Sequence, residues 1–322
     1  MKDKYIVTSA GVDGIVSAAF ALEQLDDAMI SFTRPATTHN VLNELVEGES
    51  GTIFIANLPV SPKNRHSLFR AIRDKKDWEV WYVNNDPFPG GVSASKLNTH
   101  NVVVDTTAST AEAIMRRLPG GSRLNIMLAA AASLDEGYTR TSAIGEAGRR
   151  YSMEAVGRET KRLRLTVAER YKDHRFNIGL VQHLKRGERL EQYSGFEASH
   201  ADAVTHWGAL KKVADRIVEQ HDNIAYVTME KTSGGWARLI AEYVSKKSGK
   251  PIGVCLMETE EDTQPMVFYT SRPDISLHSK VANLAISVSG SGNGGIYRAG
   301  AVIPRRKRNE MLRRLDNMLA GG

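Results

Sequence analysis

The stretch Thr8-Ser9-Ala10-Gly11-Val12-Asp13-Gly14-Ile15-Val16-Ser17-Ala18-Ala19 decides the fold of this chain. It follows the apolar segment Tyr5-Ile6-Val7, which predicts a buried strand, and its small residues predict a closely packed helix. A strand that turns directly into a helix is the unit that parallel α/β sheets repeat. In such sheets the turn lies at the carboxyl end of the strand and faces the crevice in which ligands bind.

The same alternation of strand and helix continues over the first 140 residues. Short apolar segments predict strands at 4–8, 28–33, 52–56, 79–83 and 101–104, and helical patterns lie between them, as at 15–25, 39–45 and 65–75. Another helix is expected to start near 107–112, with Ser109 or Thr110 as its cap and Glu112 in its first turn. An apolar helix is expected at 124–134. This order predicts an N-terminal, mainly parallel, doubly wound sheet.

The rest of the chain predicts a helical connector and a second, smaller α/β domain. Residues 143–187 are helical and charged, 187–199 break the helical period, and a further helix is expected at 201–220. Strands are then expected at 224–228, 251–256, 265–270 and 300–303, with helices at 235–247, 276–284 and 306–319. We therefore expect a first domain over 1–190 that includes the connector, a hinge and linker helix over 191–220, a second domain over 221–322, and a cleft between the domains.

Composition narrows the class of protein. The 322 residues are enough for two cores, and no apolar run reaches the roughly 18–20 residues that cross a bilayer. The first residues lead straight into a strand, so no signal peptide and no membrane partner are expected. The single Cys255 excludes an internal disulfide and a cysteine-based zinc site. The expected location is the cytoplasm.

Positive charge is unevenly distributed along the chain. The net charge is +6 and the pI is about 9.3, with Lys and Arg concentrated over 149–189 and in the tail, at 305–308 and 313–314. Clustered cations release counterions from nucleic-acid phosphates, which favours nucleic-acid binding. The alternative is that these residues are the solvated helix faces of a basic protein.

Four more segments carry the remaining motifs: Ile53–Pro59, Trp81–Pro87, Ala131–Asp135 and Gly290–Gly300. In order and spacing, these and the first stretch resemble the DHH phosphoesterase superfamily, in its RecJ-like form with a C-terminal DHHA-type substrate domain. The resemblance covers roughly residues 4–140 and 222–304. It implies an α/β fold and a site for a pair of divalent metal ions in the N-terminal domain.

The chain departs from that family pattern at most of the implied metal ligands. The first motif's His, Asp and Asp are matched here by Ser9, Gly11 and Asp13, and the Asp of the second motif by Asn57. The triplet Asn84-Asn85-Asp86 stands where the family has Asp-His-His. Asp135 matches the Asp of the fourth motif. In the glycine-rich segment of the second domain, Ile296 replaces the family's His.

These departures bear directly on catalysis. Two-metal hydrolysis needs anionic or imidazole ligands that hold both ions and generate hydroxide. One implied metal would rest on Ser9, Gly11 and Asn57, none of which is charged. The vestigial site that remains comprises Asp13, Asn57, Asn85, Asp86 and Asp135. Either no cofactor is required, or Asp13 and Asp135 hold one Mn²⁺ or Mg²⁺ weakly.

The resemblance also implies nucleic-acid-binding residues in the second domain. They are Arg272, Gly292, Gly294, Gly295 and Arg298, and the connector residues Lys161, Arg162 and Arg164 are expected to reach the same cleft. Glycines allow a ligand backbone to approach closely. The alternative is that the arginines are surface or ion-paired residues and the glycines mark an ordinary turn.

The first functional hypothesis is a catalytically degenerate RecJ-like protein that binds single-stranded DNA or RNA, scaffolds a replication complex, or does both. It resembles the RecJ-like replisome factors of archaea and eukaryotes, which implies GINS and MCM helicase subunits as partners. The alternative is a metal-dependent phosphodiesterase or exonuclease on short RNA or single-stranded DNA, with a reduced one-metal site built on Asp13, Asp86 and Asp135. A third hypothesis is a regulatory domain that binds a nucleotide without cleaving it.

Overall fold

The structure is a computed structural model that describes residues 3–320, except 45–49, 90–91, 98, 100, 118–124, 231 and 233. The chain divides into two compact units, Met1–His200 and Ala201–Gly322, which are described separately below. Within the described residues, no helix combines the length and the apolar character needed to cross a membrane.

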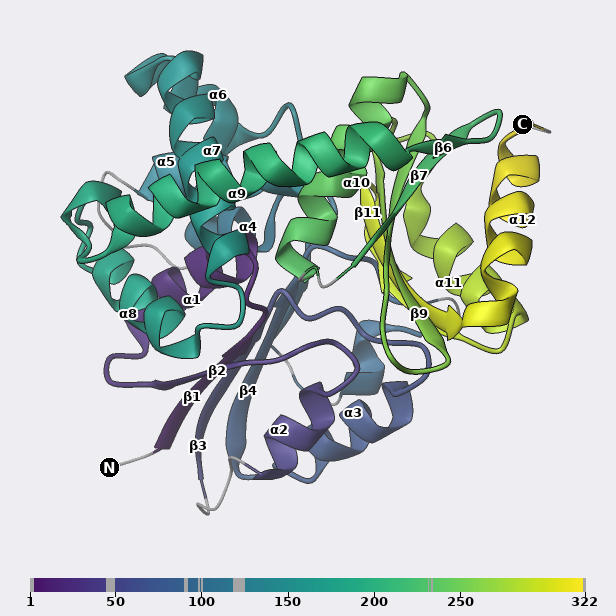
Figure 1. Ribbon diagram of the computed structural model, residues 1–322. Coiled ribbons are helices and arrows are strands. Elements are labelled where there is room, and N and C mark those ends of the chain that lie inside the picture. Colours follow the sequence, from purple (N-terminus) through teal and green to yellow (C-terminus); the bar gives the residue numbers. More distant parts are fainter. Residues whose placement is uncertain are drawn as a thin grey trace. The chain divides into compact units, whose positions relative to one another are not determined.

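The first unit is built on a five-stranded sheet in which every neighbouring pair is parallel (Figure 1). The strands are β1 (Asp3–Thr8), β2 (Met29–Phe32), β3 (Gly51–Ala56), β4 (Trp78–Asn84) and β5 (Asn101–Val104), in the order β2-β1-β3-β4-β5. All five lie where the sequence predicts them. The predicted parallel α/β class is confirmed.

Helices cover both faces of this sheet. On one face, α2 (Thr38–Glu44) and α3 (Arg65–Arg73) pack on a core of alternate strand residues, such as Tyr5, Ile53 and Val80. On the other face, α1 (Val12–Gln24) packs against α4 (Thr110–Arg117), α5 (Asn125–Glu136) and α8 (His174–Lys185) (Figure 1). The sheet is therefore doubly wound.

The helix after β1 is buried almost all round, which explains its small residues. Every residue from Val12 to Leu22 is buried. A Cβ at Gly14 would lie 2.1 Å from the Ser9 carbonyl oxygen, so only glycine fits there. The closely packed helix that the small residues predict is confirmed.

The charged segment 143–187 forms three helices: α6 (Ser142–Tyr151), α7 (Met153–Glu169) and α8. Ser152 separates the first two with a φ of +74°, and its hydroxyl accepts a hydrogen bond from the N–H of Ala155. The segment expected as a hinge contains the short 3₁₀ helix η2 (Leu190–Gln192) and the start of α9 (Phe196–Ile217), which begins five residues earlier than predicted.

The second unit contains a mixed six-stranded sheet in the order β10-β11-β9-β8-β7-β6. The strands are β6 (Glu219–Gln220), β7 (Ile224–Met229), β8 (Ile252–Met257), β9 (Thr263–Thr270), β10 (Ser291–Gly294) and β11 (Arg298–Pro304). Within this second sheet, β7 and β8 are paired in parallel, and the other described neighbours are antiparallel. The glycine-rich segment, predicted as a loop, instead forms β10 and the turn into β11.

Three helices flank this second sheet. The helix α10 (Gly234–Ser248) packs against β7, β8 and β9. On the other face of the sheet lie α11 (Leu277–Ser287) and α12 (Arg308–Ala320), as Figure 1 shows. Both helices bury apolar side chains in a core with Phe268, Leu256 and Ile303. The short 3₁₀ helix η3 (Arg305–Lys307) joins β11 to α12.

Candidate functional site

The carboxyl ends of β1 and β3 form the edge at which the strand order reverses, because β2 lies on one side of β1 and β3 on the other. This is the position of the ligand crevice in open α/β sheets. Ser9 follows β1 and Asn57 follows β3, and the Asn57 amide donates a hydrogen bond to the Ser9 hydroxyl at 3.0 Å. Asn57 has a φ of +52°, a left-handed conformation that asparagine tolerates. The structure thus brings these two predicted positions together as a neutral pair.

Asp13 is fully buried in the first turn of α1, and its carboxylate points at the start of α4. It accepts hydrogen bonds from the N–H of Ala111 at 2.8 Å and of Thr110 at 3.0 Å. Ser109 completes this cap, since its hydroxyl accepts a bond from the N–H of Glu112 at 3.2 Å. The predicted cap of α4 by Ser109 is confirmed, and Asp13 is a second capping group that sequence reasoning missed. A carboxylate is favourable there because the helix dipole is positive at its N-terminus.

The environment of Asp13 raises its pKa to about 7. Burial is the main cause, and the nearby carboxylate of Glu136 adds to it, with a smaller contribution from Asp135. The two peptide N–H groups act in the opposite direction, because they stabilise the ionised form. Near neutral pH this group therefore exists in both protonation states.

Asp135 is buried near the end of α5, where it pairs with a cation from α7. The Asp135 carboxylate lies 2.8 Å from Nε of Arg164. From the sequence, Arg164 is expected in a ligand cleft, and its pairing with Asp135 is not predicted. The other connector cations differ from it: Arg162 pairs with Glu159, Glu191 and Glu197, and Lys161 is exposed.

The triplet Asn84-Asn85-Asp86 lies at the end of β4, one strand further along the sheet. The Asn84 amide donates to the backbone carbonyl of Asp86 at 3.1 Å. The carbonyl oxygen of the Asn85 side chain accepts a bond from the Thr110 hydroxyl at 3.2 Å, which places Asn85 beside the α4 terminus that Asp13 caps. Asp86 is partly buried. The pKa of Tyr82 is raised, mainly by the burial of Tyr82 itself and to a smaller extent by the negative charge of Asp86. Nδ2 of Asn84 and Oδ1 of Asn85 thus make internal hydrogen bonds, whereas the buried Oδ1 of Asn84 has no hydrogen-bond partner among the described residues.

These donor sets do not fit a pair of divalent metal ions. Hard cations need free carboxylate oxygens, and in this site Asp13 accepts two peptide N–H groups while Asp135 pairs with a guanidinium. Ser9 and Asn57 offer only neutral oxygens. Across the part of the chain that the structure describes, no three His, Cys, Asp or Glu side chains gather as a metal-binding group.

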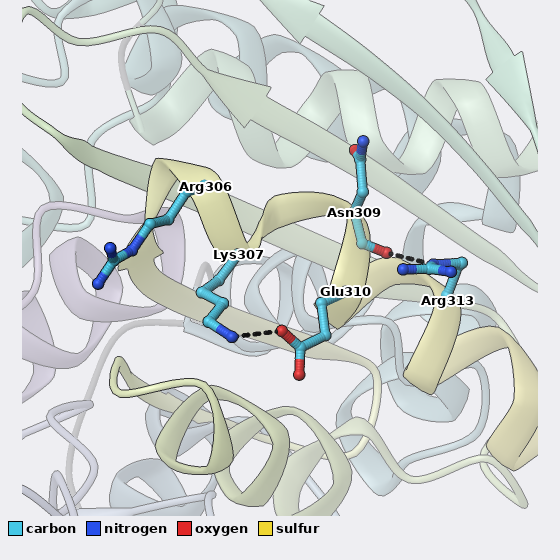
Figure 2. A pocket seen from close by; sticks show the side chains of 5 residues that line it. All are labelled: Arg306, Lys307, Asn309, Glu310 and Arg313. Carbon is cyan, nitrogen blue, oxygen red and sulfur yellow. Dashed lines mark hydrogen bonds and ion pairs between the residues drawn. The ribbon is translucent and has the colours of Figure 1, made fainter.

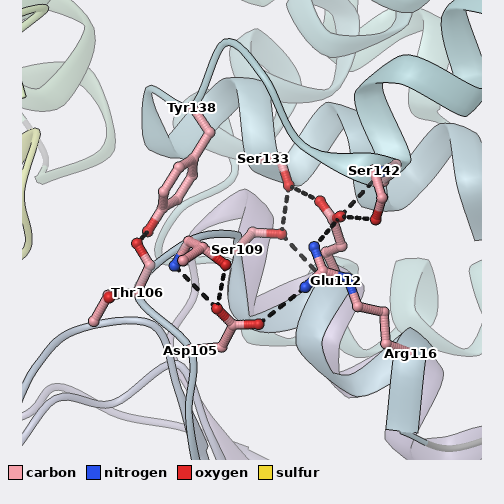
Figure 3. A network of polar contacts seen from close by, with 10 residues as sticks. Asp105, Thr106, Ser109, Glu112, Arg116, Ser133, Tyr138 and Ser142 are labelled. Atoms are coloured by element: carbon pink, nitrogen blue, oxygen red, sulfur yellow. Dashed lines mark hydrogen bonds and ion pairs between the residues drawn. The ribbon is translucent and has the colours of Figure 1, made fainter.

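A second polar network joins α4 to α5 and α6, and sequence reasoning missed it (Figure 3). The Glu112 side chain is fully buried and accepts hydrogen bonds from the hydroxyls of Ser133 at 2.8 Å and Ser142 at 2.7 Å, and from the N–H of Ala143 at 3.0 Å. It also pairs with Arg116, which reaches Asp105 at 3.0 Å. Burial acts to raise the pKa of Glu112, but hydrogen bonds from Thr141, the N–H of Ala143, Arg116 and Ser142 outweigh it, and the pKa is lowered. The only sequence signal was Glu112 in the first turn of a capped helix.

The predicted binding residues of the second unit have structural partners. Arg298 is buried on β11 and lies 3.4 Å from the Glu242 carboxylate of α10, whereas Arg272 is exposed and pairs with Asp274 at 2.6 Å. The pKa of Asp274 is lowered mainly by its hydrogen bond from Arg272.

The glycines of this segment allow close packing of β10. A Cβ at Gly294, where φ is +151°, would lie 2.4 Å from the Ala299 Cα, and one at Gly292 would lie 3.1 Å from the Ala285 Cβ of α11. Gly295 closes the turn by donating its N–H to the Arg298 carbonyl at 2.7 Å. These contacts give Gly292 and Gly294 a packing role against β11 and α11, which the sequence did not predict.

No protein-family model matches this sequence, and no curated protein matches it. Solved structures do resemble the whole chain. A DHH domain described as belonging to a member of a family of ribosomal proteins aligns with a TM-score of 0.68 at 13% identity, covering 99% of this chain and 86% of that one. RecJ of Thermus thermophilus in complex with Mn²⁺ aligns with a TM-score of 0.62 at 12% identity, covering 100% of this chain and 52% of that one. This chain therefore spans about half the length of that RecJ chain.

A third structure matches end to end. The pGpG-specific phosphodiesterase PggH of Vibrio cholerae has a TM-score of 0.57 at 13% identity, and the alignment covers 99% of both chains. Likeness at this level of identity reports the fold. The resemblance predicted from five short segments is confirmed at that level.

Proposed function

We propose that this chain, which has the fold of DHH proteins such as RecJ, binds single-stranded nucleic acid without hydrolysing it. One observation carries the noncatalytic part of this proposal. Two of the three carboxylates in the vestigial site are engaged within the first unit, Asp13 by the N-terminus of α4 and Asp135 by Arg164.

A metal ion at this site would have to displace those partners. Binding a cation through Asp13 would leave two buried N–H groups of α4 without acceptors, which costs about 1–3 kcal/mol for each group. Binding through Asp135 would break a buried ion pair. We therefore propose that no metal cofactor is required and that Mn²⁺ or Mg²⁺ binds, if at all, weakly at Asp13 and Asp135.

Two features support nucleic acid as the partner. A RecJ protein whose fold this chain shares is described as an exonuclease, so that fold accommodates a polynucleotide in a relative. The chain itself carries a net charge of +6, and Arg272 is an exposed arginine among the residues that the resemblance implies for binding. Net positive charge favours association with phosphates.

The test separates binding from hydrolysis. A fluorescein-labelled single-stranded 20-mer, as DNA and as RNA, is titrated with the protein at 50–200 mM salt, with EDTA or with Mn²⁺, and anisotropy is measured. Samples are resolved on gels in parallel, together with the dinucleotide pGpG as a short substrate. We expect binding that weakens with salt and is indifferent to EDTA, with no shortened product.

Mn²⁺-dependent product would overturn the proposal and support the one-metal phosphodiesterase, provided that Asp13→Asn abolishes it while circular dichroism shows a folded protein. Absence of any oligonucleotide binding would equally overturn it.

The scaffold form of the proposal, with GINS and MCM helicase subunits as partners, has a separate test. The tagged chain is purified from its own cells, and failure to recover those subunits would remove that form.

A further inference from the structure

The start of the last helix concentrates positive charge. Residues 305–314 include one acid, Glu310, and six cations, which we call the α12 basic strip: Arg305, Arg306, Lys307, Arg308, Arg313 and Arg314. No residue of η3 is buried. In α12, Arg313 and Arg314 are exposed. The strip therefore presents its charge to solvent.

The strip is mounted on a firmly packed element. Met311, Leu312 and Leu315 are completely buried in the core of the second unit. Their spacing places them on one side of α12, so Arg313 and Arg314 project from the other. The helix that carries Arg313 and Arg314 is consequently anchored in the core of the second unit.

The strip is only partly neutralised by its own contacts. Glu310 is shared, with Lys307 at 2.7 Å and Arg314 at 2.6 Å. Arg313 donates to the backbone carbonyl of Asn309 at 3.4 Å, a contact that leaves its charge uncompensated. Within the described residues, Arg306 has no hydrogen bond or ion pair. Arg306, Lys307, Glu310 and Arg313 line a surface hollow. Figure 2 shows the Arg306 side chain pointing away from the Lys307–Glu310 pair.

Folding stability does not account for this arrangement. Cations near the first turn of a helix oppose its dipole, by about 0.3–1 kcal/mol each, and the six like charges repel one another. A bound polyanion would relieve both effects.

We propose that the α12 basic strip binds the sugar-phosphate backbone of single-stranded nucleic acid. This inference rests on the proposed function and adds to it a contact surface that the family resemblance did not imply. Arginines bind phosphate oxygens through paired N–H groups. Residues 305–320 contain no aromatic side chain on which a base could stack, so contact through phosphates alone is expected. The strip then binds DNA and RNA alike, without preference for sequence.

The experiment compares two variants that carry the same change in net charge. Arg306→Glu/Arg313→Glu alters the strip, and Arg73→Glu/Lys76→Glu alters two exposed cations of the first unit. Binding of a labelled 30-mer of deoxythymidine is measured by anisotropy at several salt concentrations. We expect the strip variant to bind at least about tenfold more weakly, with its log–log salt slope reduced by about 1.4 for two lost phosphate contacts. The control variant is expected to bind within about twofold of the wild type.

The outcomes separate the two proposals. If the wild type binds and the strip variant binds equally well, the inference about the strip is wrong while nucleic-acid binding stands. If the wild type does not bind, the proposed function fails and the strip inference fails with it. Phosphatidylserine vesicles are a further arm: loss of vesicle binding in the strip variant, with oligonucleotide binding unchanged, would assign the strip to a membrane surface instead. The milder Arg306→Gln/Arg313→Gln variant repeats the comparison if charge reversal disturbs folding.

Discussion

At the residue scale, Asp13 combines complete burial with two hydrogen bonds from peptide N–H groups. Its pKa in the folded protein is raised to about 7 from an ordinary value of 3.8, first by burial and then by Glu136. The folded state therefore holds the proton more tightly than the unfolded state. The stability that this group contributes is full below pH 3.8 and is lost as pH rises towards and through 7.

We predict that replacing Asp13 by Asn removes this pH dependence. Between pH 5 and pH 8 the wild type should lose about 2–3 kcal/mol of unfolding free energy relative to the variant, because a shift of one pKa unit corresponds to about 1.4 kcal/mol. Urea unfolding of both proteins at the two pH values measures the difference. The variant itself is expected to be less stable at pH 5, since an amide accepts only one of the two N–H bonds. Parallel pH profiles for the two proteins would contradict the assignment.

The Arg164–Asp135 pair supports a second prediction. Arg164→Met leaves a buried carboxylate near Asp13 without its cation, and we expect a loss of about 3 kcal/mol of unfolding free energy. Adding Asp135→Asn should restore at least half of that loss, because the unpaired charge is then gone. Urea unfolding at pH 7 of the two single variants and the double variant gives the coupling. As a control, Arg150→Met breaks the surface pair with Glu146 and should cost less than about 1 kcal/mol.

A cost for Arg164→Met no greater than for Arg150→Met would mean that the Asp135 carboxylate does not depend on this cation.

Asp13 and Asp135 were identifiable from the sequence because motif order marks them. Their partners were not, since the two N–H groups belong to a helix almost 100 residues away and Arg164 to a charged helix with several equivalent arginines.

At the scale of elements, Glu112 connects three helices through one carboxylate. Glu112→Ala would leave the buried N–H of Ala143 without an acceptor, whereas the Ser133 hydroxyl keeps Ser109 as an acceptor, so we predict a loss of about 1–3 kcal/mol. Because the pKa of Glu112 is lowered, its contribution is present above pH 4.5 and is lost as pH falls below that value. Urea unfolding at pH 7 and pH 3.5 measures both effects. Glu146→Ala is the matched control, because Glu146 of α6 is only partly buried and pairs with Arg150 at the surface.

The loss in Glu112→Ala should shrink at the lower pH. An equal loss at both pH values would show that the ionised carboxylate is not what the hydroxyls and Arg116 stabilise.

Strands and helices with a clear period could be predicted from the sequence, and the glycine-rich segment could not. The apolar run at 52–56 matches β3 closely because burial of this central strand on both faces demands nearly uninterrupted apolar residues. The run at 101–104 matches the edge strand β5, which is only partly buried. Residues 290–294 lack that pattern, and they form β10 because their glycines let the strand approach β11 and α11. Local composition predicts a loop there, and tertiary packing overrides it.

At the scale of the whole molecule, each unit has an apolar core of its own, and neither core includes the carboxylates of the vestigial site. The sheet order of the first unit is fixed by strands such as β1 and β3, whose side chains pack on helices. Of the residues that the family resemblance implies for metal binding, Asp13 caps α4 and Asp135 is ion-paired with Arg164. Folding of this chain is therefore expected to be independent of divalent metal.

We predict accordingly that Mn²⁺ leaves thermal stability unchanged. A ligand that binds only the folded state with a Kd of about 10 µM would add about 2.7 kcal/mol at 1 mM, which corresponds to a rise of several degrees in Tm. For this chain we expect a shift of less than about 1 °C between 1 mM Mn²⁺ and 1 mM EDTA. Differential scanning calorimetry is suitable because it resolves separate transitions if the two units unfold independently. A rise of several degrees that Asp13→Asn removes would establish a metal site at Asp13, and it would restore the one-metal phosphodiesterase as the better interpretation of this fold.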